Sequence, residues 1–180
     1  MSQLQQIALL ANYNQWINEK IYAGAATLSP EAIRRDQGAF FKSILGTLNH
    51  NIVGDIIWLQ RFAVHPRRFA ALALLENRER PQALDQILSE DLTKLQTWRA
   101  QLDDVIMNWA AELSDDDLQT GLHYKNMQGI AQHKLLGSLI AHFFNHQTHH
   151  RGQLTTLLMQ NGVDIGVTDL LATIPDIEAV

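Results

Sequence analysis

Hydrophobic residues recur at three- and four-residue steps through four long segments, and this spacing constrains the fold more than any other feature of the chain. The segments cover residues 4–28, 40–62, 84–113 and 134–160. Such steps place apolar side chains on one face of a helix, whereas a half-buried strand requires strict alternation, which is almost absent here. We therefore predict an all-α protein in which four long helices form a four-helix bundle.

The connections between these segments limit the order of the helices. Roughly ten residues join the first two segments, which suits antiparallel neighbours. Residues 63–83 separate the second and third segments, and a connection of that length can cross the bundle and join a parallel pair. We expect an up-down-down-up order with a long crossover between helices two and three, with simple alternation as the other arrangement. The length of 180 residues predicts a single domain, residues 1–180.

Three short motifs predict where helices start or stop. Ser29 followed by Pro30 is typical of a capped start for a short helix, and Ser114 followed by three aspartates predicts another. Asn161-Gly162 is a C-terminal signal for the last long helix.

Composition argues against several classes of protein. The formal net charge of −5 and the absence of a basic aromatic patch argue against binding to nucleic acid. No stretch approaches the roughly 18 apolar residues of a membrane span, and the N-terminal residues lack the pattern of a signal peptide. Cysteine is absent, which excludes disulfides, thiolate ligands and a cysteine nucleophile. We expect a soluble cytoplasmic protein that contacts neither nucleic acid nor membrane.

Histidine is concentrated in the last predicted helix, where four of the eight histidines lie within residues 142–150. His146 and His150 are four residues apart, so both imidazoles can point to one place, as in helical zinc sites. His142 shares that row one turn earlier, while His149 lies about 100° further round and is expected at the rim. Because one such pair can also arise by chance, a metal pair and buried histidines without a metal both stay open.

His50 is the candidate third ligand. It lies midway along the apolar segment 40–62, where a lone histidine is usually a hydrogen-bonded core residue. A pair of histidines on one helix nevertheless needs a further protein ligand for a stable site, and bundles supply it from a facing helix.

Several motifs resemble the DinB/YfiT-like family of metal-dependent enzymes, and the resemblance covers nearly the whole chain. The most specific is Asn-His-Gln-Thr-His-His-Arg-Gly-Gln, because this family often has Asn-His-x-x-x-His-Arg-Gly at that point. The matching residues are 13–18, 48–50 with Trp58 and Arg61, 126–129, 145–153, 162–164 and 169–171.

The resemblance implies a four-helix bundle, commonly a homodimer, with one divalent metal ion on His50, His146 and His150. All three histidines are present. Three neutral imidazoles leave a fourth position open for water or substrate, as in catalytic zinc sites. Zinc or nickel is expected, and iron also accepts imidazole.

Two enzymatic activities and one non-enzymatic role fit such a site. Some members of the family resemble transferases that use a low-molecular-weight thiol, whose activation needs an open metal position but no protein base. Hydrolysis by metal-bound water normally adds a carboxylate base. The residue after His146 is Gln147, which cannot accept a proton, so Asp55 from another helix is the candidate base. A non-enzymatic metal-binding stress-response protein is the third alternative.

Four residues around the histidines have predicted supporting roles. Gly152 inside a helix costs about 1 kcal/mol relative to alanine, which indicates close approach by another helix or a dimer partner. Asn145 and Gln153 are candidates to orient the ligands. Arg151 is expected to pair with an acid across the bundle, or else to meet an anionic substrate.

Overall fold

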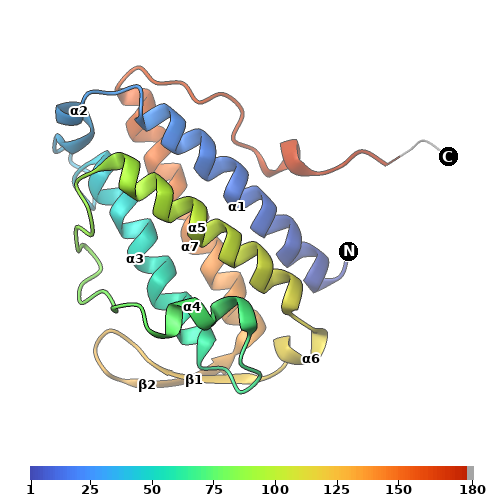
Figure 1. Ribbon diagram of the computed structural model, residues 1–180. Coiled ribbons are helices and arrows are strands. Elements are labelled where there is room, and N and C mark those ends of the chain that lie inside the picture. The colour runs from blue at the N-terminus through green and yellow to red at the C-terminus, as the bar shows by residue number, and fades with distance from the viewer. Residues whose placement is uncertain (178–180) are drawn as a thin grey trace.

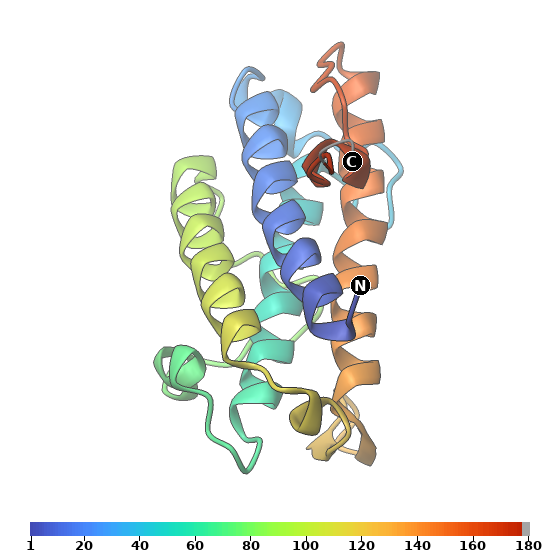
Figure 2. The ribbon, with the colours of Figure 1, turned by 90° about the vertical axis from the view of Figure 1, so that its right-hand side faces the viewer.

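The computed structural model describes residues 1–177, which are mostly helical with one small two-stranded sheet, so the expectation of a predominantly helical protein is confirmed. The four longest helices lie alongside one another (Figures 1 and 2). They are α1 Gln3–Ala25, α3 Ile44–Ala63, α5 Leu92–Glu112 and α7 Leu136–Gln160. In both views α1 and α7 run in one direction, and α3 and α5 run in the other.

Each long helix packs on two others, since α1 contacts α5 and α7, and α3 contacts α7 and α5. The centre is filled by aromatic side chains from three of them. Phe62 of α3 stacks on Trp109 of α5 at 4.7 Å between ring centroids, and Phe143 of α7 meets Phe62 edge-on at 5.8 Å. All three rings are fully buried. Burial of each such side chain stabilises the fold by roughly 1.5–3 kcal/mol, which fixes α3 firmly against α7.

Short elements connect the long helices. Ser29 and Ser114 accept hydrogen bonds from backbone N–H groups three residues on, so both predicted capped starts are confirmed. The last long helix ends at Gln160, and Gly162 adopts the left-handed φ of 77° that the C-terminal signal predicted. The short elements are α2 Pro30–Arg34, the 3₁₀ helix η1 Ala70–Leu72, α4 Ala73–Glu76, α6 Asp115–Leu118 and the 3₁₀ helix η2 Leu170–Thr173.

The second and third long helices begin later than predicted. The third begins at Leu92, because the Asp91 side chain accepts hydrogen bonds from the backbone of Thr93 and Lys94 and caps the helix there. Residues 84–91, which continue the apolar period in sequence, form an irregular connection. The second begins at Ile44 after the capping residue Ser43. The connection between α3 and α5 therefore covers residues 64–91 and crosses from one end of the molecule to the other (Figure 1).

An antiparallel hairpin precedes α7, and the prediction of an all-α chain missed it. Strands β1 Gly121–Lys125 and β2 Ala131–Leu135 pair with Gly121 opposite Leu135. Only Leu122 among these strand residues is buried, so burial imposes little alternation on the sequence. Gly129, with a φ of 79°, closes the turn between the strands.

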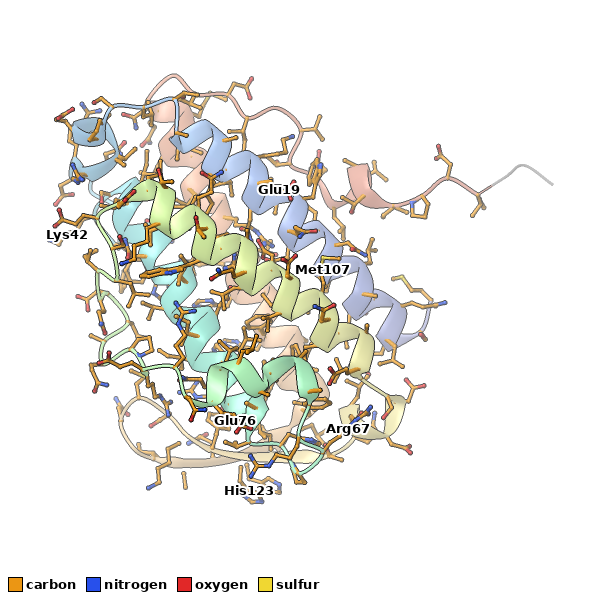
Figure 3. The ribbon with its side chains drawn as sticks, viewed as in Figure 1. Glu19, Lys42, Arg67, Glu76, Met107 and His123 are labelled. Atoms are coloured by element: carbon orange, nitrogen blue, oxygen red, sulfur yellow. The ribbon has the colours of Figure 1, made fainter. Side chains whose placement is uncertain are left out.

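The hairpin marks one end of the molecule. In Figure 3, Lys42 before α3 lies at the opposite end from Arg67, which follows α3, and from His123 of the hairpin. Helix α3 therefore runs from one end of the molecule to the other. Among the described residues, no helix is both long and apolar enough to cross a membrane.

Candidate metal centre

Helices α3 and α7 bring His50, His146 and His150 together, and one ligand nitrogen of each lies within 4.8 Å of the other two. The Nε2 atom of His50 lies 3.3 Å from Nε2 of His146 and 3.1 Å from Nε2 of His150. Zinc–imidazole bonds of about 2.0–2.1 Å in a tetrahedral site separate two ligand nitrogens by about 3.3 Å. These three residues, which we call the histidine triad, therefore have the spacing of a group that could hold a metal ion.

Hydrogen bonds at the outer ring nitrogens set the tautomers of two triad members. Nδ1 of His50 donates to the backbone carbonyl of Leu84 at 2.7 Å, and Nδ1 of His150 donates to Oε1 of Gln153 at 2.9 Å. A neutral imidazole that donates from Nδ1 has a lone pair on Nε2. The two Nε2 atoms thus face each other as acceptors at 3.1 Å, an arrangement that a cation between them would stabilise.

The surroundings keep the triad neutral. Burial, reinforced by the neighbouring histidines, lowers the pKa of His146 to about 3. Burial also lowers the pKa of His150 to about 4, although its hydrogen bond with Gln153 acts in the opposite direction. The pKa of His50 is lowered as well, again chiefly by burial. Because a metal ion binds the unprotonated ring, these nitrogens are available as ligands at neutral pH.

Gly54 makes room for His146 between the helices. A Cβ atom at this position would lie 2.9 Å from Cε1 of His146. This is shorter than the contacts that Cβ atoms make with other heavy atoms in proteins, so a larger residue would force the His146 ring to move. Gly54 is one turn after His50 on α3, so a glycine there leaves the space into which the His146 ring projects. A glycine inside a long apolar helix is a sequence signal for such a close approach, although nothing in the sequence alone connects Gly54 with His146.

Phe41 covers one side of the centre. Its ring stacks on His50 with centroids 3.7 Å apart and meets His150 edge-on at 5.5 Å. Phe41 is buried, whereas its neighbour Phe40 is exposed. The apolar period of residues 40–62 predicts a helix that includes both residues and indicates no role for Phe41 at the triad. It lies instead in the turn before Ser43, which folds the ring back over the triad.

The other two histidines of the α7 cluster lie outside the triad. The ring of His142 is 6.0 Å from that of His146 and contacts Trp58, while His149 is exposed beside His150, at the rim as predicted. The α7 pattern therefore places two histidines in the triad and two around it.

Asp55 and Gln147 join the same two helices behind the triad. The fully buried carboxylate of Asp55 accepts a hydrogen bond from Nε2 of Gln147 at 2.9 Å through one oxygen. Its other oxygen forms an ion pair with Arg99 of α5. Both oxygens are engaged inside the core, so this geometry does not present Asp55 as a general base.

Asp55 and Gln147 belong to a larger buried polar network that links all four long helices. Arg99 also pairs with Asp103 at 3.0 Å, and Asp103 accepts hydrogen bonds from Asn14 and Asn18 at 2.7 and 3.0 Å. Burial raises the pKa of Asp103 to about 6, against the opposing effect of Arg99. The members of this buried polar network are Asn14, Asn18, Asp55, Arg99, Asp103, Gln147 and Arg151.

The predicted supporting residues have mixed outcomes. Gln153 orients His150, as proposed from sequence. Arg151 is buried and donates to Asn14 and Thr148. Its link to an acid is indirect, because the side-chain amide of Asn14 lies between Arg151 and Asp103. Asn145 is exposed and forms no side-chain hydrogen bond with any described residue. No described atom lies within 4 Å of a Cβ added at Gly152, so close approach within the chain does not explain that glycine.

Comparisons with known proteins give the family that the chain resembles. A family model described as "DinB family" matches residues 1–177. Protein DinB of Bacillus subtilis (strain 168) is 26% identical over 160 residues, which cover 89% of this chain and 88% of that protein. No solved structure matches the chain.

Proposed function

This chain belongs to the DinB family, and from that premise we propose that it is a metal-dependent enzyme holding one divalent ion on His50, His146 and His150. The observation that carries the proposal is the pair of Nε2 atoms that face each other as acceptors while both Nδ1 atoms donate outward. Buried acceptors without a donor are costly. A bound cation would remove that cost and explain why three imidazoles meet at this point.

Zinc or nickel is the expected metal, and iron would also accept these ligands. Imidazole suits all three ions, and the triad contains no thiolate or carboxylate that would narrow the choice. The ion, when bound, would act as a Lewis acid at an open coordination position and stabilise an anionic group of the substrate. Phe41 would keep water from one side of that position, and Gln153 would hold the orientation of His150.

The reaction we propose is activation or transfer of a low-molecular-weight thiol. A hydrolase of this kind needs a carboxylate to take a proton from water. Asp55 is occupied by Arg99 and Gln147, and no acid joins the histidines in the group that could hold a metal. A thiol bound as thiolate needs no such base, and the chain's own lack of cysteine leaves no competing thiol.

The wider setting of this site is also part of the proposal. We expect the four long helices to form one domain, a four-helix bundle of up-down-down-up order, and the protein to act as a cytoplasmic homodimer. An isologous dimer that approached α7 closely at Gly152 would give that residue the role that nothing within the described chain explains.

Metal content is the first test. Untagged protein should contain about one divalent ion per chain by elemental analysis. His146→Ala should lose it, because two imidazoles bind far less tightly than three. His123→Ala, which removes an exposed histidine of the hairpin, is the matched control and should keep full content. Equal metal content in wild type and His146→Ala would disprove the three-histidine site.

Activity is tested separately on protein loaded with zinc or nickel. A panel of small thiols and electrophiles should give thioether or thiol-exchange products that depend on His146. Hydrolysis of ester or amide substrates at a higher rate, with no thiol dependence, would favour the hydrolase instead. A fully loaded protein without either activity would support the non-enzymatic metal-binding role.

A further inference from the structure

A row of side chains extends from the triad along α3 toward the hairpin. His50, Gly54, Trp58 and Arg61 follow one another at three- and four-residue steps, so they share one face of the helix. The ring of Trp58 contacts His142 at 4.9 Å between centroids, and His142 lies next to His146 on α7. The row therefore connects the triad with Arg61 through contacts between aromatic rings.

Arg61 is buried without a counter-charge. Arg61 is 8% exposed, and its Cζ lies 4.5 Å from the ring centroid of Trp58 and 4.9 Å from that of Tyr124, two rings that contact each other with centroids 5.5 Å apart. Among residues 1–177 its guanidinium forms no ion pair, and its Nε–H is buried with no acceptor. Contact with the aromatic rings does not use the N–H groups at the edge of the guanidinium, which stay free to donate to a ligand.

Arg80 adds a second positive charge near Arg61. Burial lowers the pKa of Arg61, and the neighbouring Arg80 lowers it further. Arg80 lies in the connection between α3 and α5, four residues before Leu84, whose carbonyl accepts from His50. This connection therefore follows the same face of α3 from Arg61 to the triad. In contrast, Arg99 of α5, which is also deeply buried, is neutralised by two aspartates.

We propose that Arg61 binds a carboxylate of the substrate while the reacting thiol occupies the metal position at the triad. Arg61 is two helical turns beyond Gly54, the residue against which His146 packs, so thiol and carboxylate would be separated by about 10 Å. The substrate class is thus a mercaptocarboxylate of medium length, bound at both ends. This inference rests on the proposed thiol chemistry, but the Arg61 subsite can be measured without it.

The test uses cobalt-loaded protein and three small probes: mercaptohexanoate, its neutral amide, and hexanoate, which lacks the thiol. Thiolate binding to cobalt is followed by the charge-transfer absorption, and binding of hexanoate by calorimetry. Mercaptohexanoate should bind about tenfold more tightly than the amide in wild type, because only the acid can form charge-assisted hydrogen bonds with Arg61. Arg61→Gln should remove this preference and leave the affinity for the amide unchanged.

Two further variants make the result interpretable. Arg61→Lys keeps the charge and should retain part of the preference, which protects the test against a folding defect in Arg61→Gln. Arg34→Gln, which changes an exposed arginine of α2, is the matched control and should behave as wild type.

The outcomes separate the two proposals. If no thiol binds cobalt but hexanoate still binds in an Arg61-dependent way, the thiol chemistry fails and the anion subsite stands. If thiols bind but acid and amide bind equally, or if Arg61→Gln keeps the preference, the subsite is overturned and the proposed function stands. Loss of binding of all probes in Arg61→Gln and Arg61→Lys alike would also overturn it, since a specific carboxylate contact cannot affect the neutral amide.

Discussion

The histidine triad and the buried polar network both include residues of α3 and α7, and they differ in how their polar groups are satisfied. In the network, the two charges of opposite sign at Arg99 and Asp55 are in contact, and Asp103 adds a second acid held by two asparagines. In the triad, three neutral rings point acceptor nitrogens at one another. The charges of Asp55, Arg99 and Asp103 are paired within the network, whereas the facing Nε2 atoms of His50 and His150 have no donor between them among the described residues.

This difference indicates that the two clusters contribute to different properties. Removal of one member of a buried ion pair leaves the charge of its partner buried and uncompensated. A substitution in the network should therefore lower the stability of the folded state. The Nε2 acceptors of the triad have no donor in the protein, so they should contribute little to the stability of the fold and are available to bind a cation. We therefore expect substitutions in the network to change stability, and substitutions in the triad to change metal affinity.

The largest effect on stability should come from Asp55→Ala. The substitution leaves Arg99 with one carboxylate and removes the acceptor of Gln147, and breaking a buried pair costs about 3–5 kcal/mol. Urea denaturation of the metal-free protein measures this. Asp104→Ala on the exposed side of α5 is the control and should cost under about 0.5 kcal/mol. Similar midpoints for both variants would contradict the stabilising role of the network.

The second largest effect should be the gain in stability on binding zinc, which depends on the triad. At free zinc of 100 times its dissociation constant, the folded state should gain about 2.7 kcal/mol. His150→Ala should abolish this gain in a thermal melt. In the presence of a chelator, His150→Ala should be about as stable as wild type, because it removes an acceptor that faced another acceptor. A large loss of stability in the chelated variant would mean that the triad is a structural cluster like the network.

Acid should weaken the metal-free protein through the triad. The pKa values of His146 and His150 in the folded state, about 3 and about 4, lie below the ordinary value of 6.5. At a pH between the folded and the ordinary pKa values, the unfolded chain binds more protons than the folded chain. The contribution of these histidines to stability is therefore full above about pH 7 and is lost as the pH falls through 6.5 toward 4. The loss from pH 7 to pH 5 should be about 1–2 kcal/mol for His146. His146→Gln should flatten that part of the curve, and an unchanged slope would contradict the neutral triad.

The smallest effect should come from the hydrogen bond that orients His150. Gln153→Ala removes the acceptor of its Nδ1–H and should weaken zinc binding about tenfold, or about 1.4 kcal/mol, without changing the number of ions bound. Competition with a chelating dye gives the affinity. Gln160→Ala, an exposed glutamine on the same helix, should bind as wild type. Full affinity in Gln153→Ala would mean that packing alone orients the ring.

Sequence reasoning recovered the helical character and the capped starts at Ser29 and Ser114, because these depend on local hydrogen bonds and on the period of a helix. It also placed His146 and His150 on one face of α7, since residues four apart meet there in any helix. The hairpin before α7 was missed, because its strands are mostly exposed and carry little alternation.

The rest depends on contacts between segments that are far apart in the chain. The distance of 3.1 Å between His50 and His150 joins residues 100 positions apart, and only the packing of α3 on α7 brings them together. Leu84 was expected in a helix, where its carbonyl would be engaged, yet it accepts from His50 because the cap at Asp91 starts α5 later. Asp55 could be a base or a core residue by sequence, and the position of Arg99 on a third helix gives it a counter-charge in the core. Local periodicity thus determines which residues share a face, while the helix that each face meets follows from the packing of the whole core.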